Sequence, residues 1–179
     1  CGDACSRAMS FNPYRPKPPA SWATEGAPTC LQELEKGSSE YLAVYHYWRE
    51  AMPDSMEVSR IERCENAALF RSYAIYRQLV ADELLQAEEE PDAEAWLWNM
   101  CDYSVDRAVQ DGFMPNRTEL LSDVYGRGVY FARDVRLAHR SILARSIVTR
   151  ERPGVYEPYK LILAQVMVGH CAGAPKLTN

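Results

Sequence analysis

The stretch Tyr125-Gly126-Arg127-Gly128-Val129-Tyr130-Phe131-Ala132 decides how the rest of the chain is interpreted. Its two glycines allow unusual backbone conformations, and the β-branched and aromatic residues that follow are typical of a buried strand. The octet therefore predicts a loop that leads into a strand. This order argues against the dinucleotide fingerprint of a Rossmann unit, in which the glycines follow a strand and open a helix.

The composition is that of an ordinary globular domain. The chain has 179 residues, of which 47% are hydrophobic and 25% charged, so it is long enough to bury a sizeable core. The net charge is −5 and no basic run stands out, so nucleic acid is an unlikely partner. No apolar run approaches the roughly 20 residues of a membrane span, and no signal segment opens the chain. We expect a soluble, intracellular domain, in the nucleus or cytoplasm.

The six cysteines lie at positions 1, 5, 30, 64, 101 and 171, and only the first two are closely spaced. This spread favours reduced thiols over a disulfide framework. Cys1 and Cys5 are either half of a zinc site whose other ligands lie outside the chain or two ordinary thiols. The second interpretation is the simpler one, and we expect no bound metal.

The first half of the chain divides into a linker, a helix and a strand. Residues 1–30 are rich in Pro, Ser, Gly and Ala and predict a linker that becomes ordered near Trp22, so the folded domain is expected over 31–179. Ser38 and Ser39 predict the start of a helix that ends near Pro53. Its apolar face is expected to carry Tyr41, Val44, Tyr45 and Trp48. Alternating apolar and polar residues predict a half-buried strand over 56–63.

The second half begins with the longest predicted helix, capped by Asn66 and fading into an acidic run that ends at Glu90. Its apolar stripe is expected to carry Leu69, Tyr73, Tyr76, Val80 and Leu84. A short strand over 95–98 follows, and then a brief helix from Ser104 through Val109, closed by Gly112. After the octet, the pattern predicts a helix from Asp134 to about Ile147 and a buried strand over 161–168 that closes at Gly169.

Several blocks match one set of family motifs in the same order. They are Ser38–Pro53, Val58–Asn66, Ala68–Tyr73, Trp96–Cys101, Asp111–Phe113, Tyr125–Ala132 and Lys160–Gly169. Together they resemble the catalytic domain of the poly(ADP-ribose) polymerase family, most closely its mono-ADP-ribosylating members. The octet resembles the family's Tyr-Gly-Lys-Gly-x-Tyr-Phe-Ala signature almost residue for residue. Matching motifs in the correct order over roughly residues 18–169 make a specific signal.

The resemblance implies an α+β fold with two packed, mainly antiparallel sheets, flanking helices and an extended cleft for the substrate NAD+. The family breaks the nicotinamide–ribose bond and passes ADP-ribose to a protein acceptor. Tyr130 then offers a flat face to the nicotinamide or its ribose, and Asn99 stands where the family has a catalytic His. The implied cofactor-binding positions are Asn99, Met100, Cys101, Gly126, Gly128, Tyr130, Phe131, Ala132, Ala138 and Ser141. Gly126 and Gly128 have a second explanation, a tight turn before a strand.

The departures from the family pattern concern the nicotinamide site. Asn99 and Met100 replace the His that bonds the ribose hydroxyls and the Gly whose backbone bonds the carboxamide. Ala138 and Ser141 replace a Ser that bonds the carboxamide and a Tyr that stacks on the ring. Each lost buried hydrogen bond costs on the order of 1 to 3 kcal/mol, so one or two such losses are expected to weaken NAD+ binding tenfold to several hundredfold without abolishing it. On one interpretation, His139 contacts the cofactor from a position shifted relative to the family's ligand. On the simpler interpretation, it is a surface or capping residue of the helix.

The end of the family fold is expected to be missing, because its last strands come after the position of Gly169 and this sequence stops at Asn179. Two functions remain open. One is a weak mono-ADP-ribosyltransferase. The alternative is an inactive relative that binds NAD+, ADP-ribose or a protein, and an unliganded scaffold is a third interpretation.

Overall fold

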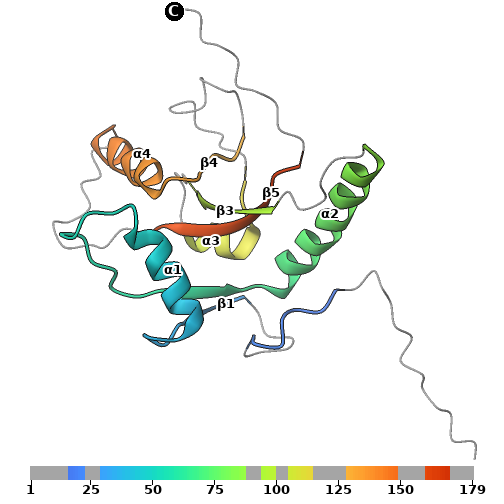
Figure 1. Ribbon diagram of the computed structural model, residues 1–179, viewed down its shortest axis with the longest axis horizontal. Coiled ribbons are helices and arrows are strands. Elements are labelled where there is room, and N and C mark those ends of the chain that lie inside the picture. Colours follow the sequence, from blue (N-terminus) through green and yellow to red (C-terminus); the bar gives the residue numbers. More distant parts are fainter. Residues whose placement is uncertain are drawn as a thin grey trace, which may run out of the picture.

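The computed structural model describes residues 16–22, 29–87, 94–99, 105–114, 128–148 and 160–169, with side chains described for all of these except 142–148. Within these ranges the chain forms four helices and two antiparallel sheets, which confirms the predicted α+β class. In Figure 1, α1 and α4 lie toward the left end of the strands β3 and β5, and α2 lies toward their right end.

The first sheet pairs β1 (Cys30–Glu33) with β2 (Glu62–Glu65) in antiparallel register, with Cys30 opposite Glu65. The sequence predicted neither partner correctly. β1 begins at the last residue of the predicted linker, and residues 56–61 of the predicted strand form no strand. Met56 and Val58 nevertheless pack against the core, so the alternating pattern reported burial rather than strand pairing. The strand pairing of this segment begins only at Glu62, where β1 lies alongside it.

Helix α1 (Ser39–Arg49) begins as predicted. Ser38 is its N-cap, and the Ser38 hydroxyl accepts a hydrogen bond from the Tyr41 N–H at 3.2 Å. Tyr41 and Trp48 are buried, which confirms the predicted apolar face. The helix ends at Arg49, four residues before Pro53, and the Arg49 guanidinium donates to the Pro53 carbonyl at 3.0 Å.

Helix α2 (Ala67–Gln86) follows its predicted cap, Asn66, whose side chain accepts from the N–H groups of the first turn. Val80 and Leu84 are buried as expected, but Tyr76 is 61% exposed and does not belong to the buried stripe. At 100° per residue, Tyr76 lies about 50° from the mean direction of the other four predicted stripe residues. The buried face of α2 is therefore narrower than the sequence pattern indicated.

The second sheet has the order β4-β3-β5, with β3 (Glu94–Asn99) in the centre. β4 (Phe131–Ala132) and β5 (Ile162–Met167) are both antiparallel to it. All three strands were predicted. β5 pairs with β3 along six residues, from Glu94 opposite Met167 to Asn99 opposite Ile162. The short β4 contacts only the last two residues of β3, so the octet's strand lies at one end of the sheet.

Helix α3 (Val105–Asp111) precedes the octet, and α4 (Val135–Val148) follows it. The predicted cap Ser104 lies outside the described residues. Gly112 ends α3 with a φ of +84°, a conformation that glycine adopts without strain, and its N–H donates to the Ala108 carbonyl at 3.0 Å. A Cβ at this position would also lie 3.1 Å from Leu69, so Gly112 also allows α2 to approach.

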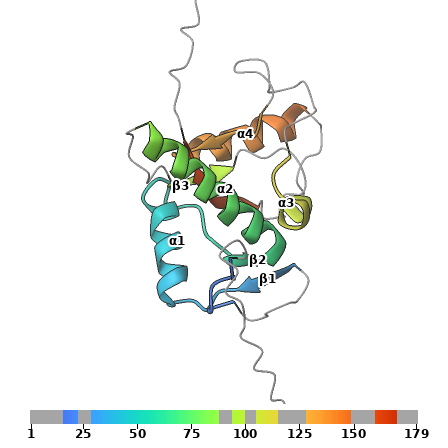
Figure 2. The same ribbon diagram turned by 90° about the vertical axis from the view of Figure 1, so that its right-hand side faces the viewer.

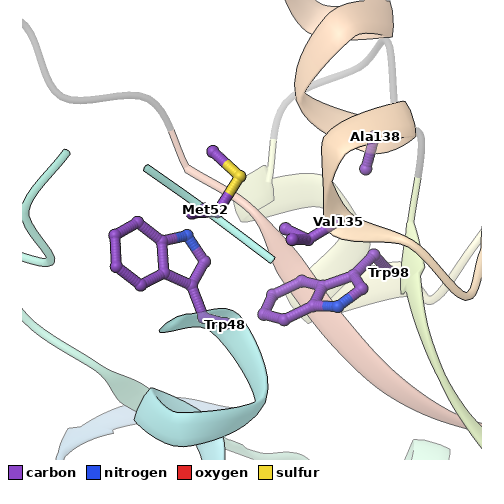
Figure 3. Packing of buried hydrophobic residues seen from close by; sticks show 5 residues of the cluster. All are labelled: Trp48, Met52, Trp98, Val135 and Ala138. Atoms are coloured by element: carbon purple, nitrogen blue, oxygen red, sulfur yellow. The ribbon is translucent and has the colours of Figure 1, made fainter. Parts of the chain in front are cut away.

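The main core cluster joins α1, β3 and α4. Figure 3 shows the five buried side chains that form it, and these are Trp48, Met52, Trp98, Val135 and Ala138. Tyr47 from α1 stacks on Trp98, with ring centroids 5.8 Å apart and planes 8° apart. Trp22 lies edge-on to Phe70 with centroids 5.4 Å apart, so the chain is packed against α2 at Trp22.

No helix in the described ranges is both long enough and apolar enough to cross a membrane.

Candidate functional site

Asn99 and Tyr130, the two candidate catalytic residues, lie together at the end of the second sheet. Asn99 is the last residue of β3, and Tyr130 immediately precedes β4. Asn99 is only 2% exposed, and its Nδ2 donates to the Tyr130 carbonyl oxygen at 3.2 Å. The sheet register places Asn99 opposite Phe131 on one side and Ile162 on the other. The fold therefore brings both candidates to one place, although they are 31 residues apart in the chain.

The Asn99 side chain has one acceptor that the described residues do not use. Its Oδ1 is buried and has no hydrogen-bond partner among the described residues. An unsatisfied buried acceptor costs about 1 to 3 kcal/mol, and native proteins rarely leave one without a reason. Because Nδ2 donates one of its two N–H groups to the Tyr130 carbonyl, the amide is held in one orientation, with Oδ1 as its unused acceptor. A hydroxyl group is the natural donor for it.

The strand that follows Tyr130 uses its side chains for packing. Phe131 lies edge-on to Phe113, with centroids 5.1 Å apart and planes 80° apart, and Ala132 is buried. These contacts fix β4 and with it the Tyr130 carbonyl. Gly128 is different, because a Cβ added there would meet no atom within 4 Å. Packing within the described protein does not require glycine at this position, and the predicted close approach of a ligand stays a prediction.

Helix α4 contributes two of the predicted cofactor-binding positions. Ala138 is completely buried in the core cluster with Trp98 and Val135, so packing alone explains a small apolar residue there. Ser141 lies one turn further along and is half-buried. His139 is also half-buried, beside Ala138 in the chain. The proposed cofactor contacts of Ala138 and Ser141 stay predictions.

Three predicted positions, Met100, Cys101 and Gly126, lie outside the described residues. The backbone contact expected at Met100 and the first glycine of the octet therefore stay predictions as well. The described part of the site consists of Asn99, Gly128 and the segment from Tyr130 to Ala132.

Tyr47 supports the site in a way that the sequence did not indicate. Its hydroxyl lies 3.2 Å from the carbonyl oxygens of both Trp96 and Arg133, so it joins α1 to β3 and to the segment between β4 and α4. The stacking of its ring on Trp98 adds a second contact to β3. An aromatic residue beside the apolar face of a helix carries no sequence signal for such a bridge, because both acceptors are backbone atoms of distant segments.

A polar cluster occupies the opposite end of β3. Glu94 accepts a hydrogen bond from the Tyr73 hydroxyl, forms an ion pair with Arg77 at 2.8 Å and accepts from Gln165 Nε2 at 3.0 Å. Burial, followed by the contact with Glu94, raises the pKa of Tyr73 above its ordinary value. The cluster fastens α2 to both long strands of the sheet and lies at the other end of β3 from Asn99.

Two charged residues near the site, Asp134 and Arg136, are paired with each other. Asp134, just before α4, accepts from the Arg136 side chain at 2.6 Å and from its backbone N–H at 2.9 Å. These hydrogen bonds lower the pKa of the Asp134 carboxyl, and the same pairing raises the pKa of Arg136. Asp134 therefore stays ionised at neutral pH. Arg136 is exposed, and its guanidinium is held by Asp134.

The described ranges hold no group of three or more His, Cys, Asp or Glu side chains that could bind a metal ion. Comparison with known proteins found neither a protein-family model nor a curated protein that matches the chain.

Proposed function

We propose that this chain is an NAD+-dependent ADP-ribosyltransferase domain of the poly(ADP-ribose) polymerase type, which transfers single ADP-ribose units to protein acceptors slowly. The observation that carries the proposal is the buried Oδ1 of Asn99, an acceptor without a described partner beside Tyr130. The order of motifs around the octet supports it.

The two residues suit different parts of such a substrate. The Asn99 amide, oriented by the Tyr130 carbonyl, can accept a hydrogen bond from a ribose hydroxyl. The Tyr130 ring offers an aromatic face to the nicotinamide. During transfer the bond between nicotinamide and the ribose carbon breaks, and nicotinamide leaves with the bonding electrons. An acceptor nucleophile then forms a bond to the same carbon and releases its proton. Holding the ribose in place lowers the entropic part of this barrier.

The same geometry explains a low rate. Nδ2 of Asn99 already donates one of its two N–H groups to a backbone carbonyl, so part of the hydrogen-bonding capacity of this side chain is not available to the substrate. One lost hydrogen bond of about 1 to 3 kcal/mol corresponds to a roughly 5- to 150-fold weaker interaction.

The alternative is an inactive domain that binds a nucleotide or a protein. Two observations favour it. Asn99 is almost fully buried, and Ala138, at the position of a family hydrogen-bonding residue, is part of the core. Both positions then contribute to stability rather than to turnover.

Calorimetric titration with NAD+ distinguishes the two. The native chain, the Asn99→His, Met100→Gly double variant and an Asn99→Leu variant are compared, after circular dichroism has shown that each is folded. We expect weak binding by the native chain, tighter binding by the double variant and none by Asn99→Leu. Transfer of label from NAD+ to protein by the native chain supports the enzyme, while binding without transfer supports the alternative. If neither the native chain nor the double variant binds, the NAD+ proposal is wrong.

A further inference from the structure

Helix α2 carries an apolar ridge that extends from the flank of its buried side to the opposite face. Ile75, Tyr76 and Leu79 are 45%, 61% and 55% exposed. Figure 2 shows α2 lying across the front of the molecule, with no other helix or strand in front of it. Single exposed apolar residues are normal, but three large ones within little more than one turn form a contiguous patch.

The ridge is bounded by opposite charges. Arg71 lies four residues before Ile75, and Glu83 lies four residues after Leu79, so residues 71, 75, 79 and 83 form one row along the helix. Neither charged side chain forms an ion pair or a side-chain hydrogen bond with the described residues. The two are about 18 Å apart along the helix axis, which is too far for them to pair with each other.

We propose that this face of α2 binds a second copy of the same chain across a two-fold axis. When two α2 helices pack antiparallel about the midpoint of the row, Ile75 of each copy meets Leu79 of the other. The same operation places Arg71 of each copy beside Glu83 of the other. A positive charge at one end, a negative charge at the other and apolar residues between them are what a self-complementary interface requires.

The interface is independent of the Asn99 site, because it uses only the outer face of α2. A single pair of helices buries less surface than the roughly 1,200 Å² at the lower limit of stable interfaces. We therefore expect the dimer to be weak and reversible.

Exchange of the two charges provides the test. In Arg71→Glu both ends of the row become negative, and in Glu83→Arg both become positive, so neither variant can pair with itself. Mixed together, the two variants match at both ends. Sedimentation equilibrium of the whole chain, at protein concentrations up to about 1 mM and at low salt, measures association of each variant, of their equimolar mixture and of the Arg71→Glu, Glu83→Arg double variant.

We expect each single variant to dissociate at least about tenfold more readily than the native chain, and the mixture and the double variant to associate as the native chain does. Arg107→Glu, an exposed change on α3 with the same effect on net charge as Arg71→Glu, is the matched control and should leave association unchanged. Circular dichroism confirms that each variant is folded. The proposal is wrong if the native chain is a monomer throughout, if the single variants associate normally, or if the mixture does not recover association.

Discussion

Asn66 connects the start of α2 to the end of α3 through four hydrogen bonds. Its Oδ1 accepts from the N–H groups of Ala68 and Leu69 at 3.1 and 3.0 Å, and its Nδ2 donates to the carbonyls of Val109 and Gln110 at 2.9 and 3.1 Å. Only one orientation of the amide satisfies all four partners. The residue is 6% exposed, so water cannot readily replace them.

Asn66→Asp separates the two halves of this connection. An aspartate keeps the acceptor that caps α2, but it loses both donated bonds and directs a carboxylate oxygen at two carbonyl oxygens. With each hydrogen bond contributing about 1 kcal/mol, we expect the free energy of unfolding to fall by about 2 to 3 kcal/mol. Asn66→Ala also removes the cap, which contributes about 1 kcal/mol more. Urea unfolding followed by far-ultraviolet circular dichroism measures both values.

Hydrogen exchange then locates the effect. In Asn66→Asp the amides of α3 should lose protection while those of the first turn of α2 keep it. Ser38→Ala is the control, because it removes only the hydrogen bond from Tyr41 at the start of α1 and should leave α3 protected. Stability of Asn66→Asp within 0.5 kcal/mol of the native value, a margin typical of surface changes, would refute the reasoning.

Three further predictions concern the sheet and the core. Because burial and Glu94 raise the pKa of Tyr73, the folded state holds this proton more tightly than the unfolded state, and stability should fall as pH rises above about 10. Tyr73→Phe should flatten that decline in denaturant titrations at alkaline pH, and an unchanged slope would contradict the assignment. Trp98→Ala should lower the free energy of unfolding by about 3 to 5 kcal/mol in urea titrations, and a loss below 1 kcal/mol would show that the cluster is not the main core. Ala138→Ser should cost about 1 to 3 kcal/mol without improving NAD+ binding in calorimetry, because the added hydroxyl enters the core, and tighter binding would place Ala138 in the cofactor site instead.

The elements that the sequence predicted well are those with local signals. Ser38 and Asn66 cap α1 and α2 because a side-chain acceptor within three residues is all that a helix start requires. β3 and β5 were predicted because both are short apolar runs bounded by other elements.

The strands of the first sheet were not predicted, for a physical reason. β1 is mostly exposed and shows no alternation of buried and exposed residues. β2 forms only where β1 lies beside it. A strand forms here only because a second strand from a distant part of the chain hydrogen-bonds to it. The sequence of one segment does not show which other segment that is. The exposure of Tyr76 has a similar origin, because the width of a buried face depends on what packs against the helix.

The candidate site was predicted in part. The family resemblance assigned related roles to Asn99 and Tyr130, and the fold brings them together. The donation of the Asn99 amide to the Tyr130 backbone and the burial of Ala138 could not be predicted. Both depend on the register between β3 and β4 and on the angle of α4, which are set by contacts between distant segments.

The order of strands in the second sheet has a consequence for synthesis of the chain. Glu94 at the start of β3 accepts a side-chain hydrogen bond from Gln165 on β5, and the two residues are 71 positions apart in the chain. At about 5 to 20 residues per second, a ribosome takes roughly 4 to 14 s to make the intervening chain. During that interval the longest pairing surface of β3 has no partner, and Trp98 lacks the α4 side of its core until residues beyond 135 have been made. The nascent chain therefore leaves the longer pairing edge of β3 without its partner strand for seconds.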